Sequence, residues 1–250
     1  MKLNKDKCHL LVSGSKYEAC WAKVGPEMIW ESSHQKLLGV TIDKNLTFNH
    51  HISNICSKAG QKLTALSRLS RLMTFDKRKL LMKSFIEAQF AYSPLTWMFH
   101  DRGISQKINR LHERALRIVY KDNTLNFAQI LEKDKSVTIH IRNLHSLAIE
   151  LYKVKHSLSP IIMNNIFLEK QAPKLRSQTD FFAPQIRTVH YGEDSLRYLG
   201  PKIWNIVPDE IKESPTIELF KTNIKKWIPK CPCRLCKNYV KGLGFVTLFE

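Results

Sequence analysis

Short apolar runs that end at turn residues predict β-strands in the first 45 residues. Three segments show this pattern: Cys8–Val12, Tyr17–Val24 and Lys36–Ile42. They end respectively at Ser13-Gly14-Ser15, at Gly25-Pro26 and at Asp43-Lys44-Asn45. We expect one small antiparallel sheet fragment, which is too small to be stable without further packing.

After Asn45 the apolar residues recur at steps of three and four, which is typical of amphipathic helices. The pattern from Phe48 to Met73 predicts one long helix, with Gly60 as a possible point of close helix crossing. Further helices are predicted over 75–90, from Pro94, over 104–121, over Leu125–Leu131 and Val137–Leu158, and from Ser214-Pro215 to Trp227.

Two stretches show no helical period. Residues 170–188 are polar and contain prolines, which favours an extended connector. Residues 192–208 read as a turn-rich segment whose buried candidates are Leu196, Tyr198, Ile203 and Trp204. The predicted fold class is therefore mainly α, with a small antiparallel β remnant at the N-terminus.

The excess of positive charge predicts that this helical protein binds polyanions. The chain carries 40 Lys and Arg against 22 Asp and Glu, a net charge of +18, and its 43% hydrophobic content suffices for a core. RNA, DNA or an anionic membrane face would suit that charge. The longest apolar stretch, 88–100, is too short for a membrane span, and the N-terminus has no secretory signal pattern.

Basic residues follow one face of the helix predicted over 104–121. They recur at steps of three and four, opposite the apolar stripe, and Glu113 is the acidic residue among them: Lys107, Arg110, Arg114, Arg117 and Lys121. Neighbouring like charges on a helix repel one another, so the stripe destabilises the helix unless an anion lies against it. Two interpretations stay open, namely contact with nucleic-acid phosphates and a solvated basic face.

Sequence motifs for catalysis are missing from the chain. It has neither a phosphate-binding Gly-rich loop nor a GxSxG or HExxH motif, and its adjacent acidic pairs lie in turn-like contexts. His140, His145 and His156 are spaced by five and eleven residues, which does not place them on one helix face, so packing roles are expected.

The cysteines are too few and too uneven for a disulfide framework, which favours a reducing compartment, nucleus or cytoplasm. Cys231, Cys233 and Cys236 are crowded in a Cys-x-Cys-x-x-Cys segment that offers three thiolates to a metal. A structural zinc needs a fourth ligand, which must come from across the fold or from another chain, and the nearest preceding histidine is His190. Free thiols, a disulfide and another metal are the alternatives.

Several segments together resemble the C-terminal part of a reverse transcriptase from a non-LTR (LINE-type, jockey-like) retrotransposon. These are MKLNKDKCHLLVSG (1–14), KLLGVTID (36–43), NRLHERALRIVYKD (109–122), YLGPKIWNIVPDEIK (198–212), FKTNIKKW (220–227) and CPCRLCKNYVKGLGF (231–245). The resemblance implies the end of a palm sheet over 1–45, a helical thumb-like domain over 46–168, a connector and helical region over 169–230, and a Cys-rich tail over 231–250.

The resemblance implies RNA, DNA or an RNA–DNA hybrid as partners, and an upstream half of the polymerase. The catalytic aromatic-x-Asp-Asp motif and its Mg²⁺ would belong to that upstream part, since this chain has no Asp-Asp pair. We therefore expect a fragment of an RNA-directed DNA polymerase that binds nucleic acid and is inactive alone. The alternatives are an inert transposon remnant and a domesticated interaction module with a zinc-linked tail.

Overall fold

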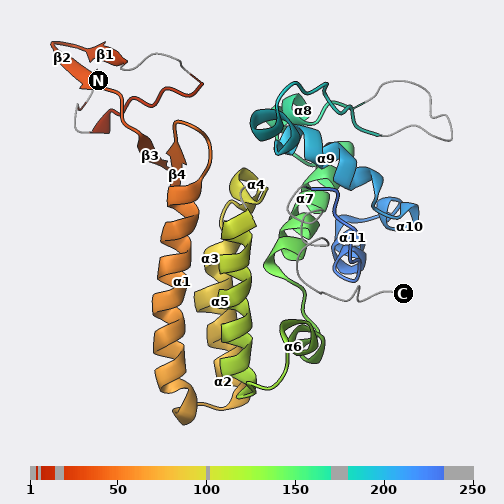
Figure 1. Ribbon diagram of the computed structural model, residues 1–250. Coiled ribbons are helices and arrows are strands. Elements are labelled where there is room, and N and C mark those ends of the chain that lie inside the picture. Colours follow the sequence, from red (N-terminus) through yellow and green to blue (C-terminus); the bar gives the residue numbers. More distant parts are fainter. Residues whose placement is uncertain (1–3, 5–6, 15–19, 100–101, 170–179, 234–250) are drawn as a thin grey trace.

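The computed structural model describes residues 4, 7–14, 20–99, 102–169 and 180–233, and in these the chain is mainly helical (Figure 1). Two separate antiparallel β-hairpins precede the helices. One pairs β1 (Trp21–Val24) with β2 (Glu27–Trp30), and the other pairs β3 (His34–Leu37) with β4 (Val40–Asp43). The predicted class, mainly α with a small antiparallel β part, is thus confirmed.

The expected single sheet is wrong. The run predicted as one strand over 36–42 contains the turn between β3 and β4, where Leu38 and Gly39 adopt positive φ angles of 45° and 87°. Gly25-Pro26 joins β1 to β2, and Cys8–Val12 contributes only an isolated bridge from Leu10 to Glu31. Among the described residues each hairpin pairs only with itself, which does not support the palm and thumb assignment.

Asp43, at the end of β4, fixes the turn into the first long helix. Its carboxylate accepts main-chain N–H bonds from Asn45 at 3.2 Å, Thr47 at 3.0 Å and Phe48 at 2.6 Å. Burial by itself would raise the pKa of Asp43, but these hydrogen bonds outweigh burial and lower the pKa below its usual value. The carboxylate also lies next to a helix N-terminus, where negative charge is favourable.

The described helical part has three helices of 17 to 21 residues and several shorter ones, and Pro94 opens one of the short helices as predicted. In chain order the elements are α1 (Asn49–Leu69), η2 (Ser70–Leu72), α2 (Phe75–Leu81), η3 (Met82–Glu87), α3 (Ala88–Ala91), α4 (Pro94–Trp97), α5 (Arg102–Tyr120), α6 (Phe127–Asp134), α7 (Ile139–Lys155), α8 (Ile161–Ile166), η4 (Val189–Glu193), α9 (Leu196–Asn205), α10 (Asp209–Lys212) and α11 (Ile217–Ile224). None of the helices in the described ranges is long and apolar enough to cross a bilayer.

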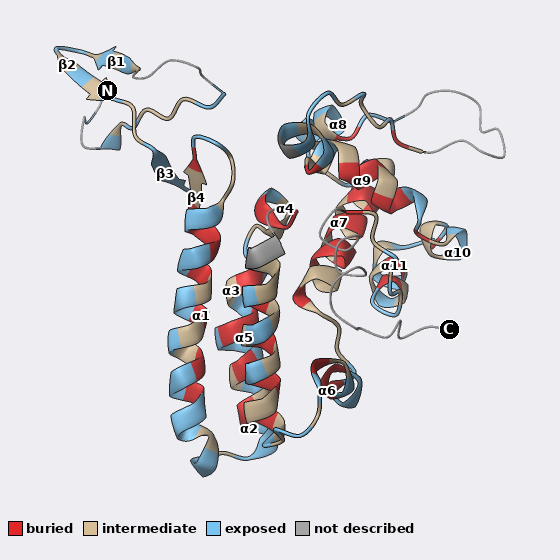
Figure 2. Ribbon diagram, viewed as in Figure 1, coloured by how far each residue is buried: buried red, intermediate tan, exposed pale blue. Residues whose placement is uncertain are grey.

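The buried apolar residues of the described chain form two clusters. The first lies between α1, η3, α5 and α6, and the buried residues of α1 line the side that faces α5 (Figure 2). The second lies between α7, α9 and α11 and also contains Phe167, Phe181 and Cys233. Helix α7 belongs to both, because Ile139 packs in the first cluster while Leu144 and the turns after it pack in the second.

Helix α9 occupies the segment expected to be turn-rich. The Ser195 hydroxyl caps it by accepting the N–H of Tyr198 at 3.3 Å, and Ile203 and Trp204 are buried as expected. Gly200 and Pro201 obscured the helix in the sequence, since both are poor helix formers. Tertiary packing explains why residue 200 is a glycine, because a Cβ there would lie 2.4 Å from the Cε1 atom of Phe167.

The last helix begins after Ser214-Pro215, the predicted start. Thr216, not Ser214, caps α11 by accepting the N–H of Leu219 at 3.3 Å. The Ser214 hydroxyl instead donates to the carbonyl of Ile211 at the end of α10, and the Ser214 carbonyl accepts the Tyr152 hydroxyl at 2.6 Å.

Candidate functional site

A row of cations covers the outer face of α5. The helix buries Ile108, Ala115, Leu116 and Val119 against its neighbours, so its opposite face lies in solvent. Exposed basic side chains fill that face: Lys107, Arg110, Arg114 and, directly after the helix, Lys121. Within the described residues, these four form no ion pair.

Arg117, the fifth predicted member of the row, is only half-buried and is already engaged. Its guanidinium contacts the Glu113 carboxylate at 2.7 Å and donates to the carbonyl of Asn123 at 2.9 Å. The latter bond closes the turn after α5, where Lys121 has a φ of 53°. The structure therefore gives Arg117 a local role, which leaves four cations without an acidic partner in the described chain.

The inner face of α5 is held by a buried ionic group. Glu87, at the end of the π-helical segment η3, accepts a hydrogen bond from Arg142 of α7 at 2.7 Å. Its other oxygen lies 3.5 Å from Nε2 of His112 on α5. Three helical segments thus meet at one carboxylate, and this fixes α5 in place.

Cys56 lies between α1 and α5, close to the cation row, and could have been a reactive thiol. Burial raises the pKa of Cys56 to about 11, although the nearby charge of Lys107 acts in the opposite direction. At neutral pH this thiol stays protonated and is a packing residue.

Three aromatic side chains of the helical body, Trp97, Tyr120 and Trp204, are not available for stacking on bases. Trp97 and Trp204 are buried in the two apolar clusters, with 3% and 0% of their surface exposed. Tyr120 is half-buried, and its hydroxyl donates to Asp134 at 2.8 Å, beside the Lys79 ammonium. These three side chains stabilise the fold, which leaves the cations as the candidate contacts to a polyanion.

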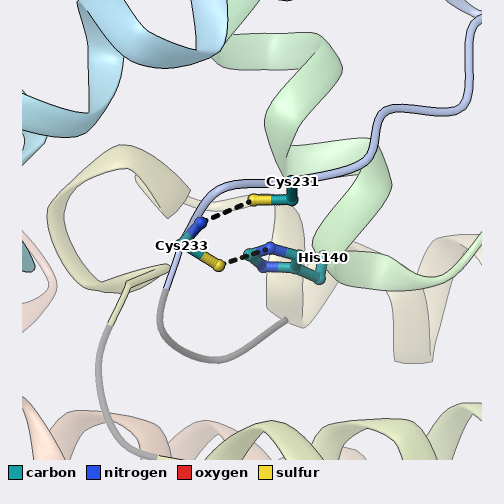
Figure 3. Close-up of side chains that lie close together, drawn as sticks. All are labelled: His140, Cys231 and Cys233. Carbon is teal, nitrogen blue, oxygen red and sulfur yellow. Dashed lines mark hydrogen bonds between the residues drawn. The ribbon is translucent and has the colours of Figure 1, made fainter. Parts of the chain in front are cut away.

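A second candidate site lies where the C-terminal segment meets α7. His140, Cys231 and Cys233 form a group that can hold a metal ion, with their ligand atoms all within 4.8 Å of one another (Figure 3). Nε2 of His140 lies 3.5 Å from the Cys233 sulfur, and the main-chain N–H of Cys233 donates to the Cys231 sulfur at 3.5 Å. The third predicted cysteine, Cys236, lies outside the described residues.

The sequence did not single out His140 as a ligand. It stands 91 positions before Cys231 and has the spacing to His145 that argues against a shared helix face. The two histidines do lie on different faces of α7, as the spacing predicts. Both nevertheless contact the same C-terminal segment of the chain. Nε2 of His145 lies 2.7 Å from the carbonyl of Trp227, four residues before Cys231.

No protein-family model, no curated protein and no solved structure matches the chain. Function is therefore inferred from the chain's own residues.

Proposed function

We propose that the chain binds nucleic acid through the outer face of α5, as the C-terminal part of a non-LTR retrotransposon reverse transcriptase. The observation that carries the proposal is the row of exposed cations Lys107, Arg110, Arg114 and Lys121, which have no acidic partner among the described residues. In this proposal the catalytic carboxylates and their Mg²⁺ belong to the upstream part of the polymerase, and this chain contributes binding.

The length of the row suits a nucleic-acid backbone. Fourteen residues separate Lys107 from Lys121, which on an α-helix is about 21 Å. One strand of a duplex carries a phosphate for roughly every 3.4 Å of axis, so the row extends along about six phosphates. Contacts of this kind give affinity and position without reading the base sequence. We therefore expect binding that tolerates changes of sequence and weakens steeply with salt.

The test is fluorescence-anisotropy binding of a labelled RNA–DNA hybrid and of a DNA duplex over a series of salt concentrations. The variant changes Lys107, Arg110 and Arg114 to Gln, which keeps the helix and removes three charges. Lys121 is left unchanged because its positive φ could make a substitution alter the end of the helix. The control changes Lys77, Lys83 and Lys225 to Gln, which are exposed lysines on other elements.

Both variants lower the net charge by three, so they differ only in where the charge is lost. We expect the α5 variant to flatten the slope of log K against log salt on the DNA duplex by about three, and the control to flatten it by less than one. Equal slopes in the two variants would show that binding follows overall charge, and the α5 face would then be a solvated surface.

A second candidate function, an interaction module with a zinc-linked tail, is favoured by the group of His140, Cys231 and Cys233. We propose Zn²⁺ as the ion, because a set of thiolates with an imidazole is typical of structural zinc sites. Metal analysis of the purified chain tests this, with one zinc per chain expected. Repeating the anisotropy series after chelation separates the two candidates, since binding through α5 should keep its salt slope without the metal.

A further inference from the structure

We propose that His140 of α7 is a ligand of this zinc, so that the metal fastens the C-terminal segment to the helical body. The inference rests on the zinc binding proposed above. It assigns Nε2 of His140 and the sulfurs of Cys231 and Cys233 to three positions of a tetrahedral site. A tetrahedral zinc site takes one further donor beside these three.

The distances fit a shared ion. In a tetrahedral site with Zn–S bonds of about 2.3 Å and a Zn–N bond of about 2.0–2.1 Å, an imidazole nitrogen and a sulfur lie about 3.6 Å apart, and two sulfurs about 3.8 Å apart. The His140 nitrogen lies 3.5 Å from the Cys233 sulfur, and each pair in the group is within 4.8 Å. Binding an ion here needs small side-chain movements and no rearrangement of helices.

The segment after Trp227 follows a path that places the cysteines next to His140. The Trp227 carbonyl is held by His145 at 2.7 Å, and six residues later Cys233 reaches His140, which lies five residues earlier on the same helix. The segment therefore runs back along α7 toward the N-terminus of that helix. Cys233 is 1% exposed and packs in the second apolar cluster, so the segment is already seated on the body.

The surroundings hold the three side chains near one another, and His140 is the second residue of α7. The N–H of Cys233 donates to the Cys231 sulfur, which is the hydrogen bond that a metal-bound thiolate accepts. The ring of Phe99 lies edge-on to the ring of His140, with the centroids 6.4 Å apart.

The consequence is that metal binding and folding are coupled. A site assembled from two segments far apart in the sequence does not exist in the unfolded chain, so metal binding adds to the free energy of folding. If the cysteines bound zinc by themselves, this coupling to α7 would be absent. The two cases differ in how the affinity for zinc responds to a change at His140.

The experiment uses the full chain with zinc as the probe and compares wild type with H140A, H140C and the control H156A. His156 follows the opposite end of α7 and is exposed, so its loss removes a histidine next to the same helix without touching the group. Zinc affinity is measured by competition with a chromophoric chelator. Co²⁺ is substituted for zinc to report the number of thiolate and imidazole ligands in its absorption spectrum. Limited proteolysis reports whether residues 228–233 are protected.

We expect H140A to bind zinc at least about a hundredfold more weakly, since even residues that only support a ligand account for 10–100-fold. H156A should match wild type. H140C should retain zinc with a stronger sulfur-to-cobalt absorption, which shows that position 140 faces the metal even if H140A fails to fold. Zinc should raise the protection of residues 228–233 in wild type and not in H140A.

Two negative results have different meanings. Wild type without zinc would overturn both the zinc assignment and the role of His140. Zinc bound equally well by wild type and H140A, with an unchanged cobalt spectrum in H140C, would leave a zinc-binding tail in place and refute the attachment to α7.

Discussion

Protonation of Glu87 should destabilise the fold in acid, because this carboxylate is buried where η3, α5 and α7 meet. Only 7% of the residue is exposed. Burial alone would raise the pKa of Glu87, but the imidazole of His112 and the guanidinium of Arg142 outweigh burial and lower it from 4.5 to about 2. The folded chain therefore binds the proton more weakly than the unfolded chain does.

The size of the effect follows from the two pKa values. The difference between 4.5 and about 2 corresponds to roughly 3 kcal/mol of stability. Because the folded pKa is the lower one, this contribution is complete above the unfolded pKa and is lost as the pH falls toward the folded pKa. On going from about pH 6 to about pH 3, the chain should lose about 2 kcal/mol through this group.

The assay is urea unfolding followed by far-ultraviolet circular dichroism at several pH values, for wild type, E87Q and the control E132Q. Glu132 is an exposed glutamate on α6. At neutral pH, E87Q should lose about 3 kcal/mol, because Arg142 keeps its charge without its partner. Wild type should lose about 2 kcal/mol more than E87Q between about pH 6 and pH 3. Parallel curves for wild type and E87Q would refute the reasoning, since the pH dependence would then come from other carboxylates.

Four further substitutions test packing and local structure by the same unfolding assay. G200A should lower the free energy of unfolding by about 1–3 kcal/mol, because the new Cβ clashes with the buried Phe167 ring. G60A should raise it by up to about 1 kcal/mol, since its new Cβ would lie 3.9 Å from the nearest side chain. Equal effects of the two variants would contradict this packing. R78M should lose at least about 2 kcal/mol, because the buried Arg78 donates to two main-chain carbonyls that would lose their partner; a neutral result would show that water replaces it. N126A should lose about 1 kcal/mol by removing the capping box of α6; an unchanged midpoint would argue against the cap.

Helices with a regular apolar face were predictable from the sequence because one local rule decides them. Steps of three and four between apolar residues placed α1 and α5 within a few residues of their ends, and the cation row followed from the same period. An element that follows from local spacing can be predicted without knowing its tertiary partners.

The errors occur where tertiary contacts override local preference. Leu38-Gly39 forms a turn inside an apolar run that lacks polar turn residues, and Gly200-Pro201 lies in a helix because the helix packs against Phe167. His140 could not be connected to Cys233 from spacing alone, since the contact joins positions 93 apart. The pattern of the cysteines left a further ligand to be found elsewhere in the chain, and only the fold brings His140 into the same group.

Helix α7 connects the two parts of the molecule through consecutive turns. Arg142 contacts Glu87, and so positions the helix that carries the cation row, while His140 and His145 contact the segment that carries the cysteines. The helix itself is held in both apolar clusters. A metal at His140 would therefore fix the C-terminal segment to the same rigid element that fixes α5. The cations themselves lie on α5 and not in the group around His140, so the two proposals can succeed or fail separately.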